Sequence, residues 1–259
     1  MIDLSGQVGV VTGAGTGIGE TIARVLAQHG ADVAVIDISQ EAAEKTRDTI
    51  VALGRRSLSV VGDVSDHDRM DAAFERIETE LGEIAFLVNN AGVSSTGYAV
   101  DLTEREWDQH FTVNAKGTFV CARICARRMI PRKRGRIVNL ASRLGLVGGA
   151  MYSHYSASKF AVVGFTQSLA LELAPYGITV NAVAPGKVDT PMLRREWDWE
   201  AELQGRDVHD IEAEIVGSIP LQRLARQEEV ARGVVFFLSE YSDYTTGHTL
   251  NVTGGLRMD

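Results

Sequence analysis

Short runs of valine and isoleucine alternate along this chain with stretches of helical periodicity, and no other feature constrains its fold as much. Strands that are apolar on both faces and separated by helices form a parallel sheet covered by helices on both sides. The pattern therefore predicts an α/β protein with a doubly wound parallel sheet, which binds ligands at the carboxyl ends of its strands. Seven runs are expected to be strands: Val8–Val11, Asp32–Ile36, Leu58–Val61, Ile84–Val88, Arg136–Leu140, Ile178–Val183 and Thr249–Val252.

The connecting segments carry helix-start signals. A long helix over 103–125 should open at a capping box formed by Thr103 and Glu106. Residues Ser65 to Asp68 resemble such a box, with Asp in place of Glu or Gln, and predict a helix that runs to Leu81. The remaining helices are expected over about 22–30, 39–54, 155–173 and 230–238.

A length of 259 residues with no visible internal repeat suits a single domain over 1–259. One stretch, 189–218, breaks the alternation of strands and helices. Thirty residues without secondary structure would be unusual inside a compact domain. We therefore expect one or two short helices there, which form a lid over the ligand crevice.

Composition excludes several classes of protein. With 26 Lys and Arg against 34 Asp and Glu, the net charge of −8 argues against nucleic acid or an anionic membrane as the main partner. The residues from Met1 to Gly6 do not resemble a signal peptide and there is no apolar run of about 18 residues, so we expect a cytoplasmic protein. Cys121 and Cys125, four apart on an expected helix, are interpreted as small core residues, although a metal or redox pair is an alternative. No metal site is expected, because the six histidines are scattered.

The first expected strand runs directly into a glycine-rich turn, Thr12–Gly19, with the spacing Gly13-x-x-x-Gly17-x-Gly19. Glycines at such a turn let the backbone approach a pyrophosphate, and the N-terminus of the following helix supplies N–H donors. A strand before the motif and a helix after it are the context that dinucleotide binding requires. A purely structural tight turn is the alternative.

Asp37 ends the second expected strand, 18 residues after Gly19. A carboxylate there can accept hydrogen bonds from the adenosine ribose and would repel a 2′-phosphate. No basic residue follows it, since Ile38 and Ser39 are next, and Thr16 in the glycine turn is also uncharged. These features favour NAD over NADP, with helix capping by Asp37 as the alternative.

Tyr155 and Lys159 are spaced to share one face of a helix. A phenol has a pKa near 10, and a neighbouring ammonium together with an oxidised nicotinamide would lower it. Tyr155 could then act as a general base in alcohol oxidation and as a general acid in carbonyl reduction. Ser142, 13 residues earlier at the end of the fifth strand, could hydrogen-bond a substrate oxygen. Because no G-x-S-x-G surrounds Ser142, a hydrolase nucleophile is disfavoured.

Taken together, these motifs resemble the short-chain dehydrogenase/reductase family over the whole chain. The motifs that match, in order, are Thr12–Gly19, Asp63-Val64, Asn89-Asn90-Ala91-Gly92, Asn114, Ser142, Tyr155-x-x-x-Lys159 and Pro185-Gly186. The resemblance implies a single Rossmann domain with a seven-stranded sheet. It also implies a homotetramer that pairs through helices around 103–130 and 152–174 and through the C-terminal segment.

The resemblance further implies a catalytic tetrad. In it, Tyr155 is the acid/base, Lys159 binds ribose and tunes Tyr155, Ser142 orients the substrate, and Asn114 holds a water of the proton relay. From the sequence alone, Asn114 could equally be a polar helix residue bonded to backbone. Asp63 and Val64 would contact adenine, Asn90 would lie against the cofactor, and Val188 and Thr190 would hold the carboxamide. The expected cofactor-binding set is Gly13, Thr16, Gly17, Ile18, Gly19, Asp37, Asp63, Val64, Asn90, Tyr155, Lys159, Pro185, Gly186, Val188 and Thr190.

Substrate specificity is expected in the lid and in the loop after Ser142. The candidate contacts are Ser94, Arg143, Leu144, Met151, Gly186, Met192, Trp197 and Trp199. The two tryptophans could instead pack the lid onto the domain. A small mixed pocket of this kind suits a polyol or vicinal diol, and the segments from Asp189 and from Gly247 look similar to sugar-alcohol and acetoin/diol dehydrogenases of the family. The alternatives are a 3-oxoacyl-thioester reductase, which usually prefers NADPH, and an NAD-binding sensor without turnover.

Overall fold

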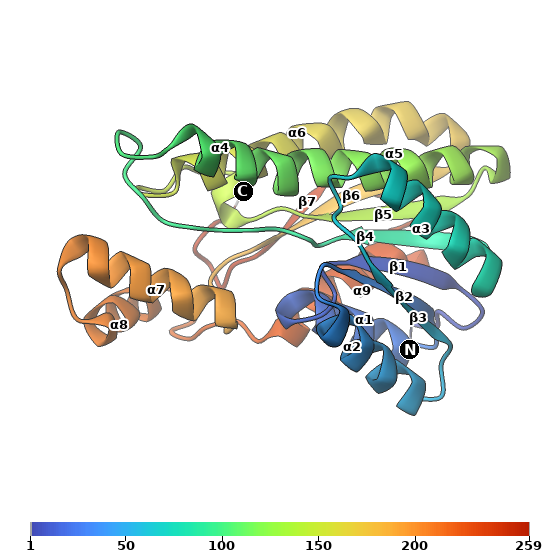
Figure 1. Cartoon of the computed structure of the whole chain (residues 1–259), viewed down its shortest axis with the longest axis horizontal. Helices are drawn as coiled ribbons and strands as arrows, with labels where there is room; N and C mark the ends of the chain where they lie inside the picture. The colour runs from blue at the N-terminus through green and yellow to red at the C-terminus, as the bar shows by residue number, and fades with distance from the viewer. Residues whose placement is uncertain (1, 259) are drawn as a thin grey trace.

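A single seven-stranded parallel sheet organises the molecule, as the sequence predicts (Figure 1). The computed structural model describes residues 2–258. The strand order is β3-β2-β1-β4-β5-β6-β7, and every neighbouring pair is parallel. The order reverses between β1 and β4, and the carboxyl ends of strands at such a point open a crevice for ligands. The strands are β1 Val8–Thr12, β2 Asp32–Asp37, β3 Ser57–Val61, β4 Ile84–Asn89, β5 Gly135–Leu140, β6 Ile178–Pro185 and β7 Thr249–Val252.

Helices cover both faces of the sheet (Figure 1). One apolar layer joins the sheet to α1, α2 and α9, and a second joins it to α3, α5 and α6. The helices of the first layer are α1 Gly17–Gln28, α2 Gln40–Ala52 and α9 Gln227–Leu238. Those on the other side are α3 His67–Glu80, α4 Glu104–His110, α5 Thr118–Met129 and α6 Ser153–Leu173. Single 3₁₀ turns occupy η2 Ile130–Arg132, η3 Arg143–Gly145, η4 Ala174–Tyr176 and η5 Glu240–Ser242.

The helix expected over 103–125 differs in its middle. Its capping box is confirmed, because Glu106 N donates to Thr103 Oγ1 at 3.2 Å and Thr103 N donates to Glu106 Oε2 at 2.8 Å. After α4, however, the chain forms a π-helical segment, η1 Phe111–Gly117, before it continues as α5. π-Helical segments widen a helix and are frequent at functional sites. Asn114 lies in this segment.

The capping box expected at Ser65 to Asp68 is wrong. Asp66 is the N-cap of α3 and accepts a hydrogen bond from Arg69 N at 3.1 Å. Ser65 instead donates from its hydroxyl to Asp63 Oδ1 at 2.8 Å. Arg69 is the third residue of α3, and the short Asp66 side chain accepts its N–H directly, so Asp66 and not Ser65 occupies the N-cap position.

Residues 189–218 contain two helices, α7 Pro191–Gln204 and α8 Val208–Ser218, as the length of the stretch predicts. Thr190 caps α7 by accepting from Leu193 N at 3.1 Å, and Gly205 ends that helix in the left-handed conformation at φ 62°. The two helices share a small apolar core and project from the rest of the molecule (Figure 1, orange).

Both cysteines lie on α5 as buried thiols that pack in the apolar layer between this helix and the sheet, which confirms their interpretation as core residues. Burial raises the pKa of Cys121 to about 12, so its thiol stays protonated at neutral pH. Within residues 2–258, no helix is long and apolar enough to cross a bilayer.

Candidate active site

The glycine turn between β1 and α1 forms an open cradle. Gly13 and Gly17 both adopt positive φ, at 59° and 61°, a backbone conformation that residues with a Cβ rarely adopt. A Cβ at Gly17 would meet no atom within 4 Å, so this position faces open space. A Cβ at Gly19, by contrast, would lie 2.1 Å from the carbonyl oxygen of Gly13. The turn is therefore tightly packed at Gly19 and accessible at Gly17.

The amino terminus of α1 suits an anion. Thr16 is the N-cap of α1, and within residues 2–258 its side chain makes no capping hydrogen bond. The first N–H groups of a helix need acceptors, and a phosphate at this place supplies them together with a charge that the helix dipole favours. The cradle at Gly17 and the uncapped helix end thus fit the pyrophosphate of a dinucleotide.

Asn90 fastens this turn to the end of β4. Its Nδ2 donates to the carbonyl oxygens of Thr12 at 3.0 Å and Gly13 at 2.9 Å. The backbone N–H groups of Asn90 and Ala91 both donate to Thr12 Oγ1, each at 3.1 Å. These four bonds cross from β4 to β1 and hold the cradle in one conformation.

Asp37 ties the end of β2 to the same turn. Its Oδ2 accepts from Gly15 N at 2.8 Å, and its Oδ1 accepts from Ser39 N at 3.0 Å. The cap of α2 is Ser39, which accepts from Ala42 N at 3.3 Å, so the alternative in which Asp37 only caps that helix is not supported. The Asp37 carboxylate borders the cavity described below.

Tyr155 and Lys159 lie on one face of α6, near Ser142 at the end of β5. Lys159 Nζ is 5.9 Å from the centroid of the Tyr155 ring and donates to the carbonyl oxygen of Leu140 at 2.8 Å. Burial lowers the pKa of Lys159 to about 8. Burial, and after it the charge of Glu196, raises the pKa of Tyr155, whereas a hydrogen bond with the Ser142 side chain lowers it.

The lowered pKa of Tyr155 was expected for a site that also holds an oxidised nicotinamide, and in the protein alone this pKa is raised instead. Desolvation of the phenolate outweighs the favourable interactions. The Lys159 ammonium is directed to the Leu140 carbonyl, and Tyr155 is a neutral phenol at neutral pH.

Asn114 is fully buried behind Gly92. Its Oδ1 accepts from Val93 N at 2.8 Å, and its Nδ2 donates to Val93 O at 3.0 Å and to Ser158 Oγ at 2.9 Å. A Cβ at Gly92 would lie 3.1 Å from Asn114 Oδ1 and 3.5 Å from Lys159 Nζ. Asn114 thus joins the segment after β4 to α6 and is not among the described residues that line the cavity, and its expected role in holding a water of the proton relay stays a prediction.

One cavity of about 610 Å³ brings these elements together at the carboxyl edge of the sheet. Every residue of the expected cofactor-binding set lines it. Ser142 and four expected substrate contacts, Arg143, Leu144, Gly186 and Met192, line it as well. The α7 helix contributes Leu193, Arg195 and Glu196 to the wall.

Four expected substrate contacts, Ser94, Met151, Trp197 and Trp199, are not among the described residues that line the cavity. Trp197 is 2% exposed and packs with Leu193, Ala201 and Ile211 in the core between α7 and α8. Trp199, two positions on, turns to another face and is 37% exposed. Leu193, Trp197 and Ala201 are spaced four residues apart on one face of α7, so Trp197 packs in this core and does not contact a ligand in the cavity.

Ser94 and Met151 instead contact residues of α7. Burial raises the pKa of Glu196, and a hydrogen bond with the Ser94 hydroxyl opposes this shift. Met151 Sδ is 4.0 Å from Gln204 Nε2 of α7. The sequence reasoning missed Lys187 and Glu196, which do line the cavity; the position of Lys187 directly after Pro185-Gly186 was the available signal.

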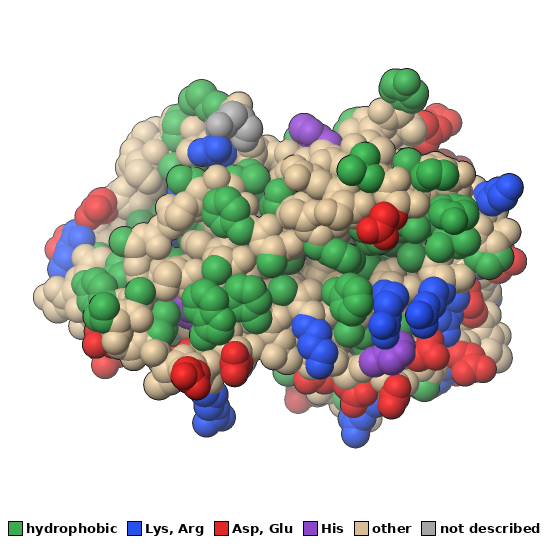
Figure 2. Space-filling view, turned by 90° about the horizontal axis from the view of Figure 1, so that it is seen from above, with side chains coloured by type: hydrophobic (Ala, Val, Ile, Leu, Met, Phe, Trp, Pro, Cys, Tyr) green, Lys and Arg blue, Asp and Glu red, His purple; other side chains and the backbone are tan. Residues whose placement is uncertain are grey.

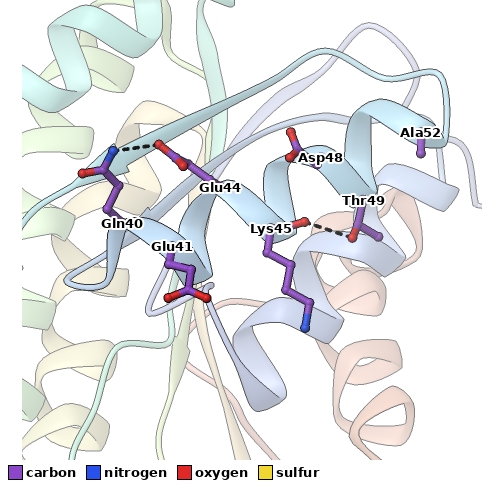
Figure 3. A pocket seen from close by; sticks show the side chains of 7 residues that line it. All are labelled: Gln40, Glu41, Glu44, Lys45, Asp48, Thr49 and Ala52. Atoms are coloured by element: carbon purple, nitrogen blue, oxygen red, sulfur yellow. Dashed lines mark hydrogen bonds between the residues drawn. The ribbon is translucent and has the colours of Figure 1, made fainter.

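A second hollow lies on the solvent-facing side of α2 and is lined by that helix alone (Figure 3). Its side chains bond to their own helix: Gln40 Nε2 donates to Glu44 Oε1 at 2.9 Å, and Thr49 Oγ1 donates to Lys45 O at 3.0 Å. Because no second element encloses a ligand there, we assign no site to it.

The fold and the main cavity define an α/β protein of the nucleotide-binding type, and comparisons with known proteins agree. The model of the family described as short chain dehydrogenase matches residues 7–201. The oxidoreductase UcpA of Salmonella typhimurium is 41% identical over 253 residues, which cover 97% of this chain and 94% of UcpA. The chain belongs to the short-chain dehydrogenase family, and it is an oxidoreductase that acts on alcohol or ketone groups.

Solved structures give the same result. An NAD+-bound xylitol dehydrogenase superposes with a TM-score of 0.95 at 33% identity, covering 97% of this chain and 99% of that one. A 3-oxoacyl-[acyl-carrier protein] reductase with bound NAD from Brucella melitensis superposes with a TM-score of 0.88 at 33% identity, covering 99% and 93%.

Proposed function

We propose that this protein is an NAD-dependent dehydrogenase of polyols or vicinal diols, with Tyr155 as its general acid/base. One observation carries the proposal: Ser142, Tyr155 and Lys159 line the same cavity as the glycine cradle and Asp37. A hydroxyl bound beside Tyr155 and a dinucleotide lying along the cradle would therefore meet within one enclosure.

The residues present fit NAD. The cradle at Gly17 and the free end of α1 would bind the pyrophosphate, and Asp37 would accept hydrogen bonds from the ribose hydroxyls while repelling a 2′-phosphate. Asp63 and Val64 would border the adenine, and Val188 and Thr190 the carboxamide. When bound, NAD supplies the acceptor for the hydride and, in its oxidised form, a positive charge that favours phenolate at Tyr155.

The reaction needs one proton transfer by the chain itself. In alcohol oxidation, Tyr155 takes the hydroxyl proton as the carbon gives up its hydride, and the carbonyl product forms. In the reverse direction, the neutral Tyr155 donates that proton to the carbonyl oxygen. Ser142 holds the same oxygen by a hydrogen bond, and the Lys159 ammonium stabilises the phenolate once it forms. Asn114 acts as a positioning residue that keeps Val93 and α6 together.

A polyol or diol fits the polar wall around Tyr155, and the structural likeness to a xylitol dehydrogenase supports this class. A 3-oxoacyl-thioester reductase is the second candidate, favoured by the likeness to the Brucella melitensis protein. Because that reductase was solved with NAD, the choice of cofactor alone does not separate the two candidates.

We also propose a homotetramer, with α7 and α8 as a lid on each subunit. Hydrophobic side chains are exposed over α4, α5 and α6 (Figure 2), among them Trp107, Phe119, Phe160 and Leu171. Apolar side chains gathered on one face are a feature of interaction sites. A monomer mass in solution would count against the tetramer. The cytoplasmic location expected from the sequence stays a prediction.

The test follows NADH absorbance with the purified protein and a panel of sugar alcohols, vicinal diols and simple secondary alcohols, with NADP in parallel. Turnover with NAD and a polyol or diol is expected. No oxidation of any alcohol, combined with consumption of NADPH in the presence of a 3-oxoacyl thioester, would replace the proposal by the second candidate. Tight NAD binding without turnover of any of these compounds would identify a sensor instead.

A further inference from the structure

Two cations in the cavity wall, Arg143 and Lys187, have no partner within hydrogen-bonding distance among residues 2–258. Arg143 directly follows Ser142, and Lys187 follows Gly186 at the carboxyl end of β6; both line the cavity. Within residues 2–258, neither side chain makes a hydrogen bond or an ion pair, whereas the surface arginines at 128, 132 and 136 are all paired with carboxylates.

Both cations are partly removed from water. Burial lowers the pKa of the Arg143 guanidinium, and burial also lowers the pKa of the Lys187 ammonium. A desolvated charge without a partner is costly, and a bound anion would offset that cost. Such unpaired, desolvated cations in a cavity are therefore typical of an anion-binding site rather than of a solvated surface.

Two carboxylates of α7, Glu196 and Glu200, attract Lys187, and of these Glu196 lines the cavity. Glu196 of α7 is only 9% exposed and lines the cavity, and Tyr152 Oη lies 3.4 Å from its Oε2. Burial raises the pKa of Glu196, while the charge of Lys187 lowers it. Beyond its hydrogen bonds with Tyr152 and Ser94, the Glu196 carboxylate keeps acceptor capacity for a hydroxyl group of a ligand.

Tyr152 connects this group of charges to the reacting centre. Lys187 Nζ is 5.5 Å from the centroid of the Tyr152 ring, and that ring is 6.4 Å from the ring of Tyr155. Arg143 is the chain neighbour of Ser142. A ligand of a few carbon atoms can therefore present one hydroxyl to Tyr155 and reach the two cations with its other end.

We propose that the substrate is a hydroxylated carboxylate, whose carboxylate binds between Arg143 and Lys187 while a second hydroxyl donates to Glu196. The proposal rests on the function proposed above and narrows its substrate class from polyols and diols to those that carry a carboxylate. A neutral polyol would leave both cations unpaired. A guanidinium fork matches the two oxygens of a carboxylate.

The experiment compares matched compounds. A five-carbon sugar alcohol and the aldonate of the same configuration are assayed with NAD, using the wild type, Lys187→Met, Arg143→Leu and, as control, Arg194→Met. Arg194 lies on α7 outside the cavity lining, where it pairs with Asp189 at 2.8 Å. Binding of the aldonate to each protein with NAD present is measured separately by calorimetry.

We expect kcat/KM to be at least about tenfold higher for the aldonate than for the sugar alcohol. Lys187→Met and Arg143→Leu should each abolish that preference and weaken aldonate binding about tenfold or more, while Arg194→Met changes neither. Equal use of the two compounds, or losses that are the same for both, would overturn the inference and leave the proposed dehydrogenase intact.

Two further outcomes separate the inference from the proposed function. Aldonate binding that depends on Lys187, without oxidation of any alcohol, would refute the dehydrogenase proposal and retain the anion site. Tighter binding of a sugar-alcohol phosphate than of the aldonate would overturn the carboxylate assignment, since it would show that the cations take a phosphate.

Discussion

Replacing Asp37 by serine should reverse the choice between NAD and NADP. Each Asp37 carboxylate oxygen already accepts one backbone N–H, from Gly15 at 2.8 Å and from Ser39 at 3.0 Å. An ionised carboxylate has about four acceptor sites, so about two remain for the ribose hydroxyls. Hydrogen bonds to charged groups contribute about 1.5–3 kcal/mol each, and the variant should weaken NAD binding at least tenfold.

The same substitution should help NADP. A unit charge pair 4 Å apart costs about 1 kcal/mol in bulk water and about 4 kcal/mol at an effective dielectric constant of 20. Removing the repulsion of a 2′-phosphate, which carries about two charges, is thus worth at least about tenfold in affinity. Together the two effects predict that the ratio of kcat/KM for NAD to kcat/KM for NADP falls by about 100-fold or more.

The assay is paired steady-state kinetics with both cofactors, after a melting curve shows that the variant is folded. Asp63→Ser is the matched control, because Asp63 lines the same cavity and bonds Ser65 beyond the end of β3. It should affect NAD and NADP equally. A wild type that prefers NADP, or an unchanged ratio in Asp37→Ser, would refute the reasoning.

Two more predictions concern the cradle and a buried histidine. Gly17→Ala should stay folded, at a cost of about 1–2 kcal/mol for its left-handed backbone, and should lose NAD affinity. Gly19→Ala should be far less stable, because its Cβ would lie 2.1 Å from Gly13 O. Equal melting temperatures of the two variants would contradict this reasoning. Burial lowers the pKa of His154 to about 4 from 6.5, so the unfolded state binds the proton first and stability falls as pH drops from 6.5 towards 4. Denaturant titrations should show a pH dependence that is shallower in His154→Gln, by up to about 1.4 kcal/mol per pH unit, and parallel curves would count against it.

The order of strands and helices could be predicted from the sequence because it rests on local patterns. Runs such as Val33 to Ile36 are apolar on every position, which only a sheet covered on both faces accommodates. The glycine turn and Asp37 were equally accessible, since each follows a strand directly and parallel strands bring their carboxyl ends to one edge.

The π-helical segment around Asn114 could not be predicted, because seven residues of altered pitch barely change the spacing of apolar positions. The close packing of Gly117, the last residue of this segment, is seen only in the structure, where a Cβ would lie 2.5 Å from Val64. The burial of Trp197 also depends on tertiary packing, because its partner Ile211 lies on the next helix, α8.

The charged residues that we propose to bind the substrate could not be identified from the sequence, for a different reason. Lys187 and Glu196 read as ordinary surface residues in the sequence, and only the docking of α7 against the cavity buries Glu196. The pKa of Tyr155 shows the same limit. Spacing alone suggests that Lys159 lowers it, but the depth of burial, which spacing does not report, raises it.

The most direct test is the rate of NADH formation by Tyr155→Phe beside the wild type, with NAD affinity measured on both proteins. The substitution removes one hydroxyl and keeps the ring that lies 6.4 Å from His110 and Tyr152. We predict a loss of about 10²–10⁴-fold in kcat with NAD affinity nearly unchanged, since general acid/base catalysis is worth that much. A variant that keeps more than about a tenth of the wild-type rate would contradict the central role of Tyr155.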